Sequence, residues 1–158
     1  MSKSAPPSSG AGHERWAEPV YVDASALVKL FVPEAESDTL NQALAGLTDV
    51  IVSDLALTEM ASALGRRTRE RLLTRGEAQR LHREATRLHA SSHQAELTPP
   101  IRRRAERLML SLTVPLRTLD ALHLATALDA EAATMVTFDP RLREAAASQG
   151  IFVAPHGL

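Results

Sequence analysis

The clearest structural pattern in the chain is the segment Val20-Tyr21-Val22-Asp23-Ala24-Ser25-Ala26-Leu27-Val28-Lys29-Leu30-Phe31. Its first three residues form a continuous apolar run, which is typical of a strand buried on both faces of a sheet. The residues after Asp23 are expected to form a helix that ends at the Val32-Pro33 break. A buried strand that leads directly into a helix indicates a parallel sheet, with Asp23 at the carboxyl edge of that sheet.

Short apolar segments and amphipathic segments alternate along the rest of the chain. This alternation predicts an α/β fold with a mainly parallel central sheet and helices on both faces, which makes three layers. A protruding helical hairpin is expected over residues 68–90, with its turn near residues 75–76. The expected strands are residues 20–22, 50–52, 95–98, 135–138 and 151–153, and the other expected helices are residues 24–31, 35–47, 54–69, 101–113, 119–130 and 141–149.

A chain of 158 residues is long enough for one domain. Residues 1–18 are rich in Ser, Pro, Gly and Ala, so we expect a disordered leader or an expression remnant there and a single domain over residues 19–158. The chain has no cysteine, which excludes disulfides and thiol chemistry and fits a reducing, cytoplasmic compartment. No run approaches the roughly 18–20 apolar residues that cross a bilayer, so no membrane partner is expected.

The charges are unevenly distributed, although the net charge is only −1. Residues 66–107 contain twelve arginines and five glutamates. Arginine suits bidentate contacts with phosphates, so this stretch could hold RNA. Equally, it could form the solvated faces of two helices, with the glutamates as helical neighbours of the arginines. Aromatic residues make up 3% of the chain, which argues against a platform for base stacking.

Four carboxylates each lie near the junction between a short apolar segment and the expected start of a helix. They are Asp23, Glu59, Asp120 and Asp139. Taken singly, three of them have plain structural explanations. Asp23 and Asp139 are suitable helix N-caps, and Asp120 lies in a first turn that favours negative charge. Glu59 is expected to point partly inward, where a bare carboxylate would cost several kcal/mol and therefore needs a cation or a hydrogen-bonding partner.

Taken together, the four acids point to a shared site. The carboxyl ends of parallel strands and the helix starts beside them converge on one crevice, whereas unrelated caps have no reason to share one edge of a sheet. Carboxylates gathered there would repel one another unless a divalent cation lay between them. Oxygen ligands suit Mg²⁺ or Mn²⁺, and such an ion can activate water to attack a phosphodiester.

The histidines have plain structural explanations. His123 follows Asp120 by one helical turn but lies in an apolar helix, so we expect it to be packed in the core. His82, His89 and His93 recur on a basic stretch without accompanying acids, and we expect them on the surface.

Four segments resemble the PIN-domain family, and more narrowly the VapC toxins of bacterial toxin–antitoxin pairs. They occur in the family's order within about residues 19–155, which makes the match far more specific than any single motif. The long leader departs from the family pattern. The segments are residues 21–30 (YVDASALVKL), 58–64 (TEMASAL), 117–125 (RTLDALHLA) and 137–142 (TFDPRL).

The resemblance implies a PIN-like fold and a Mg²⁺- or Mn²⁺-dependent endoribonuclease that cleaves an RNA substrate. It also implies a homodimer and inhibition by a cognate antitoxin protein. The residues implied are Asp23 and Asp120 as principal metal ligands, Glu59 and Asp139 as the remainder of a catalytic acidic pocket, and Ser25 and Thr137 in supporting positions.

Other α/β proteins that place an aspartate after the first strand fit less well. Phosphatases of the haloacid dehalogenase type have a second Asp two residues later, where this chain has Ser25. Receiver domains have an acidic pair near the first strand, and Asp23 has no acidic neighbour. A non-catalytic PIN-like module that binds an antitoxin or RNA stays open as an alternative, although such a module has no need for four mutually repelling carboxylates.

Overall fold

The computed structural model describes residues 15–156, and its centre is a five-stranded sheet with the strand order β3-β2-β1-β4-β5. Every pairing between neighbouring strands is parallel, which confirms the predicted mainly parallel sheet. The edge strand β3 begins at His93 rather than at residue 95, and the other strands lie within two residues of their predicted positions. The strands are β1 (Val20–Val22), β2 (Val50–Ser53), β3 (His93–Ala95), β4 (Thr134–Val136) and β5 (Phe152–Ala154).

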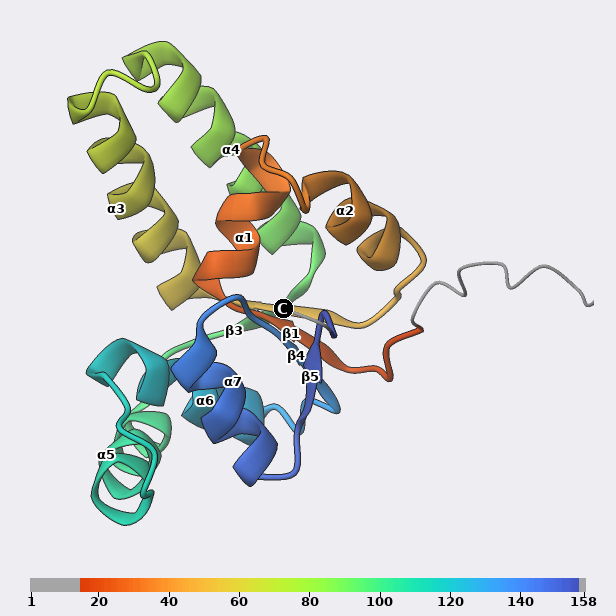
Figure 1. Cartoon of the computed structure of the whole chain (residues 1–158), viewed down its shortest axis with the longest axis vertical. Helices are drawn as coiled ribbons and strands as arrows, with labels where there is room; N and C mark the ends of the chain where they lie inside the picture. The colour runs from red at the N-terminus through yellow and green to blue at the C-terminus, as the bar shows by residue number, and fades with distance from the viewer. Residues whose placement is uncertain (1–14, 157–158) are drawn as a thin grey trace, which may run out of the picture.

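Helices cover both faces of the sheet and complete the predicted three-layer α/β/α architecture (Figure 1). Helices α1 to α4 lie on one side, and α5, α6 and α7 lie on the other. No helix within residues 15–156 is long and apolar enough to cross a membrane. The helices are α1 (Ala24–Phe31), α2 (Ser37–Ala45), α3 (Asp54–Arg69), α4 (Arg75–Ser91), α5 (Pro99–Ser111), α6 (Thr118–Asp129) and α7 (Pro140–Ser148).

Strand β1 lies in the middle of the sheet and contributes to the cores on both faces. Its three side chains are fully buried. Successive side chains of a strand point to opposite faces. Accordingly, Tyr21 packs in the core beneath α5, α6 and α7, whereas Val20 and Val22 pack in the core beneath α1 to α4. The apolar sequence of this strand therefore reflects burial on two sides.

A helical hairpin protrudes beyond the sheet, as predicted, but it consists of α3 and α4 and therefore covers residues 54–91 rather than 68–90 (Figure 1). The expected turn near residues 75–76 is wrong, because the connection covers residues 70–74. Thr74 and Glu77 explain the difference. The Glu77 backbone N–H donates to the Thr74 hydroxyl at 3.2 Å, and the Thr74 N–H donates to the Glu77 carboxylate at 2.7 Å. This reciprocal capping begins α4 at Arg75.

The end of the expected leader packs against the domain. Trp16 is only 5% exposed and belongs to the core beneath α1 to α4. The carboxylate of Glu18 accepts a hydrogen bond from the Asp49 N–H at 2.7 Å, and the Thr134 hydroxyl donates to the Ala17 carbonyl at 2.7 Å. Residues 16–18 thus contact the domain, ahead of the boundary expected at residue 19, while the leader prediction for residues 1–14 falls outside the described residues.

Replacing Trp16 with alanine is expected to lower the free energy of unfolding by about 3 kcal/mol, because truncating a buried tryptophan removes apolar contacts and leaves a cavity. Urea unfolding followed by circular dichroism measures the change. Leu110→Ala is the control, since Leu110 is exposed and its truncation should change stability by less than about 0.5 kcal/mol. Equal stability of Trp16→Ala and wild type would show that residues 16–18 do not belong to the folded unit.

Candidate active site

The four predicted acids line one cavity of about 450 Å³ at the carboxyl edge of the sheet. Each acid comes from a different place in the chain. Asp23 follows β1, Glu59 lies on α3, Asp120 lies in the first turn of α6, and Asp139 precedes α7. The same cavity is also lined by Ser25, Arg117 and His123, so the fold gathers residues that are far apart in the sequence.

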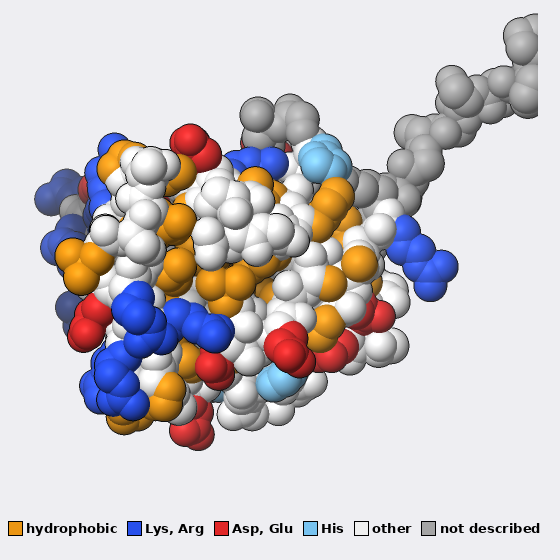
Figure 2. Space-filling model, turned by 90° about the horizontal axis from the view of Figure 1, so that it is seen from below, with side chains coloured by type: hydrophobic (Ala, Val, Ile, Leu, Met, Phe, Trp, Pro, Cys, Tyr) orange, Lys and Arg blue, Asp and Glu red, His pale blue; other side chains and the backbone are white. Residues whose placement is uncertain are grey.

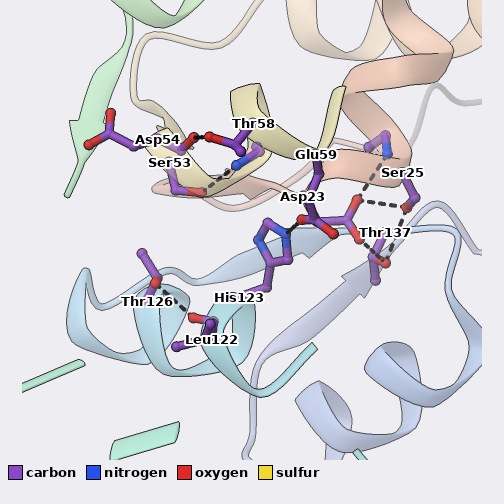
Figure 3. Close-up of polar contacts among 12 residues, drawn as sticks. Asp23, Ser25, Ser53, Asp54, Thr58, Glu59, Leu122, His123, Thr126 and Thr137 are labelled. Carbon is purple, nitrogen blue, oxygen red and sulfur yellow. Dashed lines mark hydrogen bonds and ion pairs between the residues drawn. The ribbon is translucent and has the colours of Figure 1, made fainter. Parts of the chain in front are cut away.

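Asp23 is the most enclosed of the four carboxylates, with only 3% of its surface exposed. Its Oδ1 accepts hydrogen bonds from the Ala26 N–H at 2.9 Å and from the Ser25 hydroxyl at 2.7 Å. Its Oδ2 accepts a hydrogen bond from the Thr137 hydroxyl at 2.5 Å. Figure 3 shows the two hydroxyls on the same side of the carboxylate. Asp23 is therefore a helix cap and a pocket residue at once.

Ser25 and Thr137 hold Asp23 through an arrangement that fixes the direction of their protons. The Ser25 hydroxyl oxygen accepts a hydrogen bond from the Phe138 N–H at 2.9 Å. In the same way, the Thr137 hydroxyl oxygen accepts from the Asp139 N–H at 3.1 Å. A hydroxyl has one proton to donate, and both of these protons go to Asp23. The predicted supporting pair thus connects the end of β1 to the segment that follows β4.

Burial disfavours the charged state of two of the acids. It raises the pKa of Asp23, and the charge of His123 and the hydrogen bonds from Thr137, Ala26 and Ser25 oppose this effect only in part. Burial also raises the pKa of Asp120, and the nearby charge of Asp139 raises it further. The charges of His123 and Arg117 and the surrounding hydrogen bonds thus compensate the two desolvated carboxylates only in part, an environment that a bound cation would relieve.

His123 is packed, as predicted, but it is also part of the cavity. Its side chain is 3% exposed, and its Nε2 contacts the carboxylate of Glu59. Its Nδ1 lies 2.7 Å from the hydroxyl of Tyr21, which in turn donates to the Ser53 hydroxyl at 3.1 Å. Tyr21 is not among the predicted site residues. A tyrosine in an otherwise apolar buried strand was the available signal, since a buried phenol needs a hydrogen-bonding partner.

The surface prediction for His89 is wrong. His89 is 8% exposed, and its Nε2 forms an ion pair with Asp54 at 3.1 Å, without the alignment of a hydrogen bond. It lies four residues after Ala85 and eight after Leu81, so these three side chains form the buried stripe of α4. His93 is exposed, and His82 is partly exposed.

The acidic cavity offers oxygen ligands, but its side chains are engaged with protein partners. Glu59 contacts His123, and Asp139 caps α7 by accepting from the Arg141 and Leu142 N–H groups. As the side chains lie, residues 15–156 contain no group of three or more Asp, Glu or His residues that could hold a metal ion. The donor chemistry fits Mg²⁺ or Mn²⁺ bound by few carboxylates and several waters. The predicted ligand set stays a prediction.

A larger groove of about 610 Å³ adjoins the acidic cavity. It runs between α1 and α3 and shares Ser25, Glu59 and Leu119 with the cavity. Its far part is lined by Lys29, Glu34, Arg66 and Arg67 among others, and both Lys29 and Arg67 form ion pairs with Glu34.

The chain forms an α/β domain with a parallel five-stranded sheet. It has a buried aspartate after the central strand and acids from three further elements, and these features define a PIN-type domain. The sequence profile of the PIN domain matches residues 20–148. The chain belongs to the PIN-domain family, which confirms the resemblance seen in the sequence.

Individual relatives extend this result. The chain is 37% identical over 141 residues to ribonuclease VapC46 of Mycobacterium tuberculosis, covering 85% of this chain and 95% of the relative. Among solved structures, the Mycobacterium tuberculosis sarcin-ricin loop cleaving toxin VapC20 matches with a TM-score of 0.65 and 20% identity, over 80% of this chain and 94% of the other. VapBC2 from Rickettsia felis, solved with a promoter DNA fragment, matches with a TM-score of 0.62 and 10% identity, over 85% and 96%. These two structures establish the likeness of the fold.

In EDTA, wild-type protein is expected to lose stability relative to Asp120→Asn as the pH rises. The pKa of Asp120 is raised in the folded state above 3.8, so the folded protein binds this proton more tightly than the unfolded chain does. The resulting stabilisation is complete below about pH 4 and disappears as the pH rises through the raised pKa.

Thermal unfolding of both proteins from pH 4 to 8 measures this divergence. Glu144→Gln is the control, because Glu144 is exposed on α7 and its variant should follow the wild-type curve. A constant difference between wild type and Asp120→Asn at all pH values would contradict the assignment of an unfavourable charge to Asp120.

Proposed function

We propose that this protein is an endoribonuclease that hydrolyses RNA phosphodiester bonds and acts as the toxin of a toxin–antitoxin pair. The observation that carries the proposal is the convergence of four acids, from four separate elements, on one cavity. The 37% identity to a ribonuclease over most of both chains supports the choice of RNA as substrate.

The proposed chemistry requires a Mg²⁺ or Mn²⁺ ion held mainly by Asp23 and Asp120. When bound, such an ion supplies an activated water and neutralises the charge that develops on the phosphate. The protein would contribute a rigid and a less rigid ligand. Asp23 is fixed by three hydrogen bonds, whereas Asp120 accepts one from the Arg117 N–H at 3.3 Å and is partly exposed to the cavity. Glu59 and Asp139 would complete the acidic surroundings.

The exposed arginines of the basic stretch are the proposed contacts for the rest of the RNA, and the fold divides them between α3 and α4 on one side of the sheet and α5 on the other. Figure 2 shows Lys and Arg side chains gathered on one side of the face that it presents, next to acidic and apolar side chains. Arg67 on the groove is already paired with Glu34 at 2.7 Å, whereas its neighbour Arg66 is exposed. We propose that exposed arginines of this stretch contact phosphates, which places the sequence-independent part of binding outside the acidic cavity.

The alternative is a PIN-like module that binds an antitoxin or RNA without cleaving it. The engagement of Asp139 with two backbone N–H groups of α7 favours this alternative. The buried Asp23 argues against it, because a carboxylate with a burial-raised pKa is costly to keep in a protein that makes no use of it.

Asp23→Asn and Asp120→Asn are each expected to lower the rate of RNA cleavage by at least about 100-fold, because each removes a charge that holds the ion. Cleavage of a panel of purified RNAs in Mg²⁺, in Mn²⁺ and in EDTA measures the effect. Asp38→Asn is the matched control, since Asp38 is exposed on α2 and outside the cavity.

Metal binding provides a second measurement on the same proteins. At a concentration of 100 times its Kd, an ion stabilises the wild type by about 2.7 kcal/mol, and neither pocket variant should show the full shift. Metal binding without cleavage of any RNA would favour the non-catalytic module. Cleavage by Asp120→Asn at the wild-type rate would show that Asp120 is not a metal ligand.

The proposed partners are a cognate antitoxin and a second copy of this chain. An antitoxin could inhibit by inserting an arginine among the carboxylates, where a charge-assisted bidentate contact would replace the metal. The groove beside the cavity offers a path for the segment that carries this arginine. Leu110 and Leu119 are exposed apolar side chains that a homodimer contact would cover.

Replacing the antitoxin arginine nearest the cavity with glutamine is expected to weaken inhibition by about 10- to 100-fold, because a hydrogen bond to a charged group contributes about 1.5–3 kcal/mol. Inhibition constants for RNA cleavage, measured with the original and the substituted antitoxin, test this. An antitoxin without basic residues near the cavity that still inhibits normally would refute the arginine mechanism.

A further inference from the structure

A chain of buried polar contacts connects the central strand to the acidic cavity through residues that the proposed cleavage does not use. The hydroxyl of Tyr21 on β1 lies 2.7 Å from Nδ1 of His123 on α6. Nε2 of the same imidazole contacts the carboxylate of Glu59 on α3. Figure 3 shows the imidazole pointing at Glu59, with Asp23 beside it. The contact therefore spans both helical layers at the position of the acids.

Glu59 needs such a contact more than Asp23 does. Asp23 has a short side chain and three hydrogen bonds from two hydroxyls and one backbone N–H. Glu59 has a longer side chain that is 25% exposed, and its hydrogen-bond partner within residues 15–156 is His123. Holding a glutamate in one rotamer costs conformational entropy. His123 is the group that offsets this cost at the cavity.

The imidazole is itself held in place. Its ring meets the Tyr21 ring edge to face, with centroids 5.9 Å apart and planes at 70°. The Tyr21 hydroxyl donates to Ser53, which caps α3, the helix that carries Glu59. All three of these side chains, Tyr21, His123 and Ser53, are almost completely buried. The direction of the Glu59 carboxylate is thus set from β1 and α6 together.

We infer that His123 is a positioning residue, which aims the Glu59 carboxylate into the acidic cavity and is held for this purpose by Tyr21. The inference rests on the proposed ribonuclease function. Residues that orient metal-site side chains typically change metal affinity or activity by about 10- to 100-fold when they are replaced. His123 acts through Glu59, so its replacement should have little effect in a protein whose Glu59 no longer carries a carboxylate.

The test is a double-mutant cycle of His123→Leu and Glu59→Gln. Two quantities are measured for each protein: the kcat and KM for the RNA that the wild type cleaves, and the Kd for Mn²⁺ alone in the absence of RNA. We expect His123→Leu to lower kcat or Mn²⁺ affinity by about 10- to 100-fold with little change in KM. In the Glu59→Gln background, the same substitution should have an effect of less than about twofold.

Three further variants separate positioning from simple packing. His123→Gln keeps an N–H near the place of Nε2 and should recover most of the loss. Tyr21→Phe removes only the hydroxyl and should lower the same quantity in the same direction by a smaller factor, which keeps the test informative if His123→Leu does not fold. His89→Leu is the matched control, because His89 is also buried but lies outside the cavity, and it should leave kcat and Mn²⁺ affinity unchanged.

The possible failures are distinguishable. If the wild type cleaves RNA or binds Mn²⁺ and the effects of His123→Leu and Glu59→Gln multiply, His123 acts independently of Glu59 and the inference is overturned. If His89→Leu lowered kcat or Mn²⁺ affinity by the same factor, the effect of His123→Leu would be explained by packing alone, and the inference would likewise be overturned. A folded wild type that neither cleaves RNA nor binds Mn²⁺ would overturn the proposed function, and the inference with it.

Discussion

The burial of one carboxylate at the end of the central strand is the constraint around which the other parts of the site are arranged. Strand β1 has neighbours on both sides and helices on both faces, so the residue that follows it has little access to water. Asp23 occupies this position, where its charge is disfavoured. Two hydroxyls and a helix N-terminus compensate in part. The backbone after β4 donates hydrogen bonds to those two hydroxyls. The same contacts that supply Asp23 with hydrogen bonds therefore also fix the position of Asp139, which caps α7.

Structural and functional explanations of the acids are compatible in this protein. Asp23 and Asp139 both cap helices, and Asp120 accepts a hydrogen bond at the start of α6. A cap requires an acceptor at a helix N-terminus, and in a parallel sheet several helix N-termini meet at one edge. The fold therefore brings caps together without any further requirement. Glu59 is the exception, since it lies within α3 and depends on a side chain from another helix for its position.

The sequence predicted those features that depend on neighbours along the chain. Strands β1, β2, β4 and β5, the bounds of α1 and α3, and the edge on which Asp23, Asp120 and Asp139 lie all follow from apolar runs and helix starts. Features that depend on distant residues were missed. The burial of His89 depends on Asp54 of α3, and that of Trp16 on a core assembled from later segments. The contact between His123 and Glu59 joins residues 64 positions apart, and no local pattern specifies it. The position of the hairpin turn, by contrast, was predictable from nearby residues, because Thr74 and Glu77 form a recognisable capping pair.

The strand order also determines when the site first exists during protein synthesis. Asp23 receives a hydrogen bond from Thr137, which lies 114 residues later in the chain, and β1 pairs with β4 in the middle of the sheet. A ribosome adding about 5–20 residues per second takes roughly 6–23 seconds to cover that distance. Throughout this interval the growing chain carries Asp23 but lacks the Thr137 hydroxyl that orients it. Each newly made molecule therefore spends its time on the ribosome with an incomplete cavity, whatever the finished protein does to RNA.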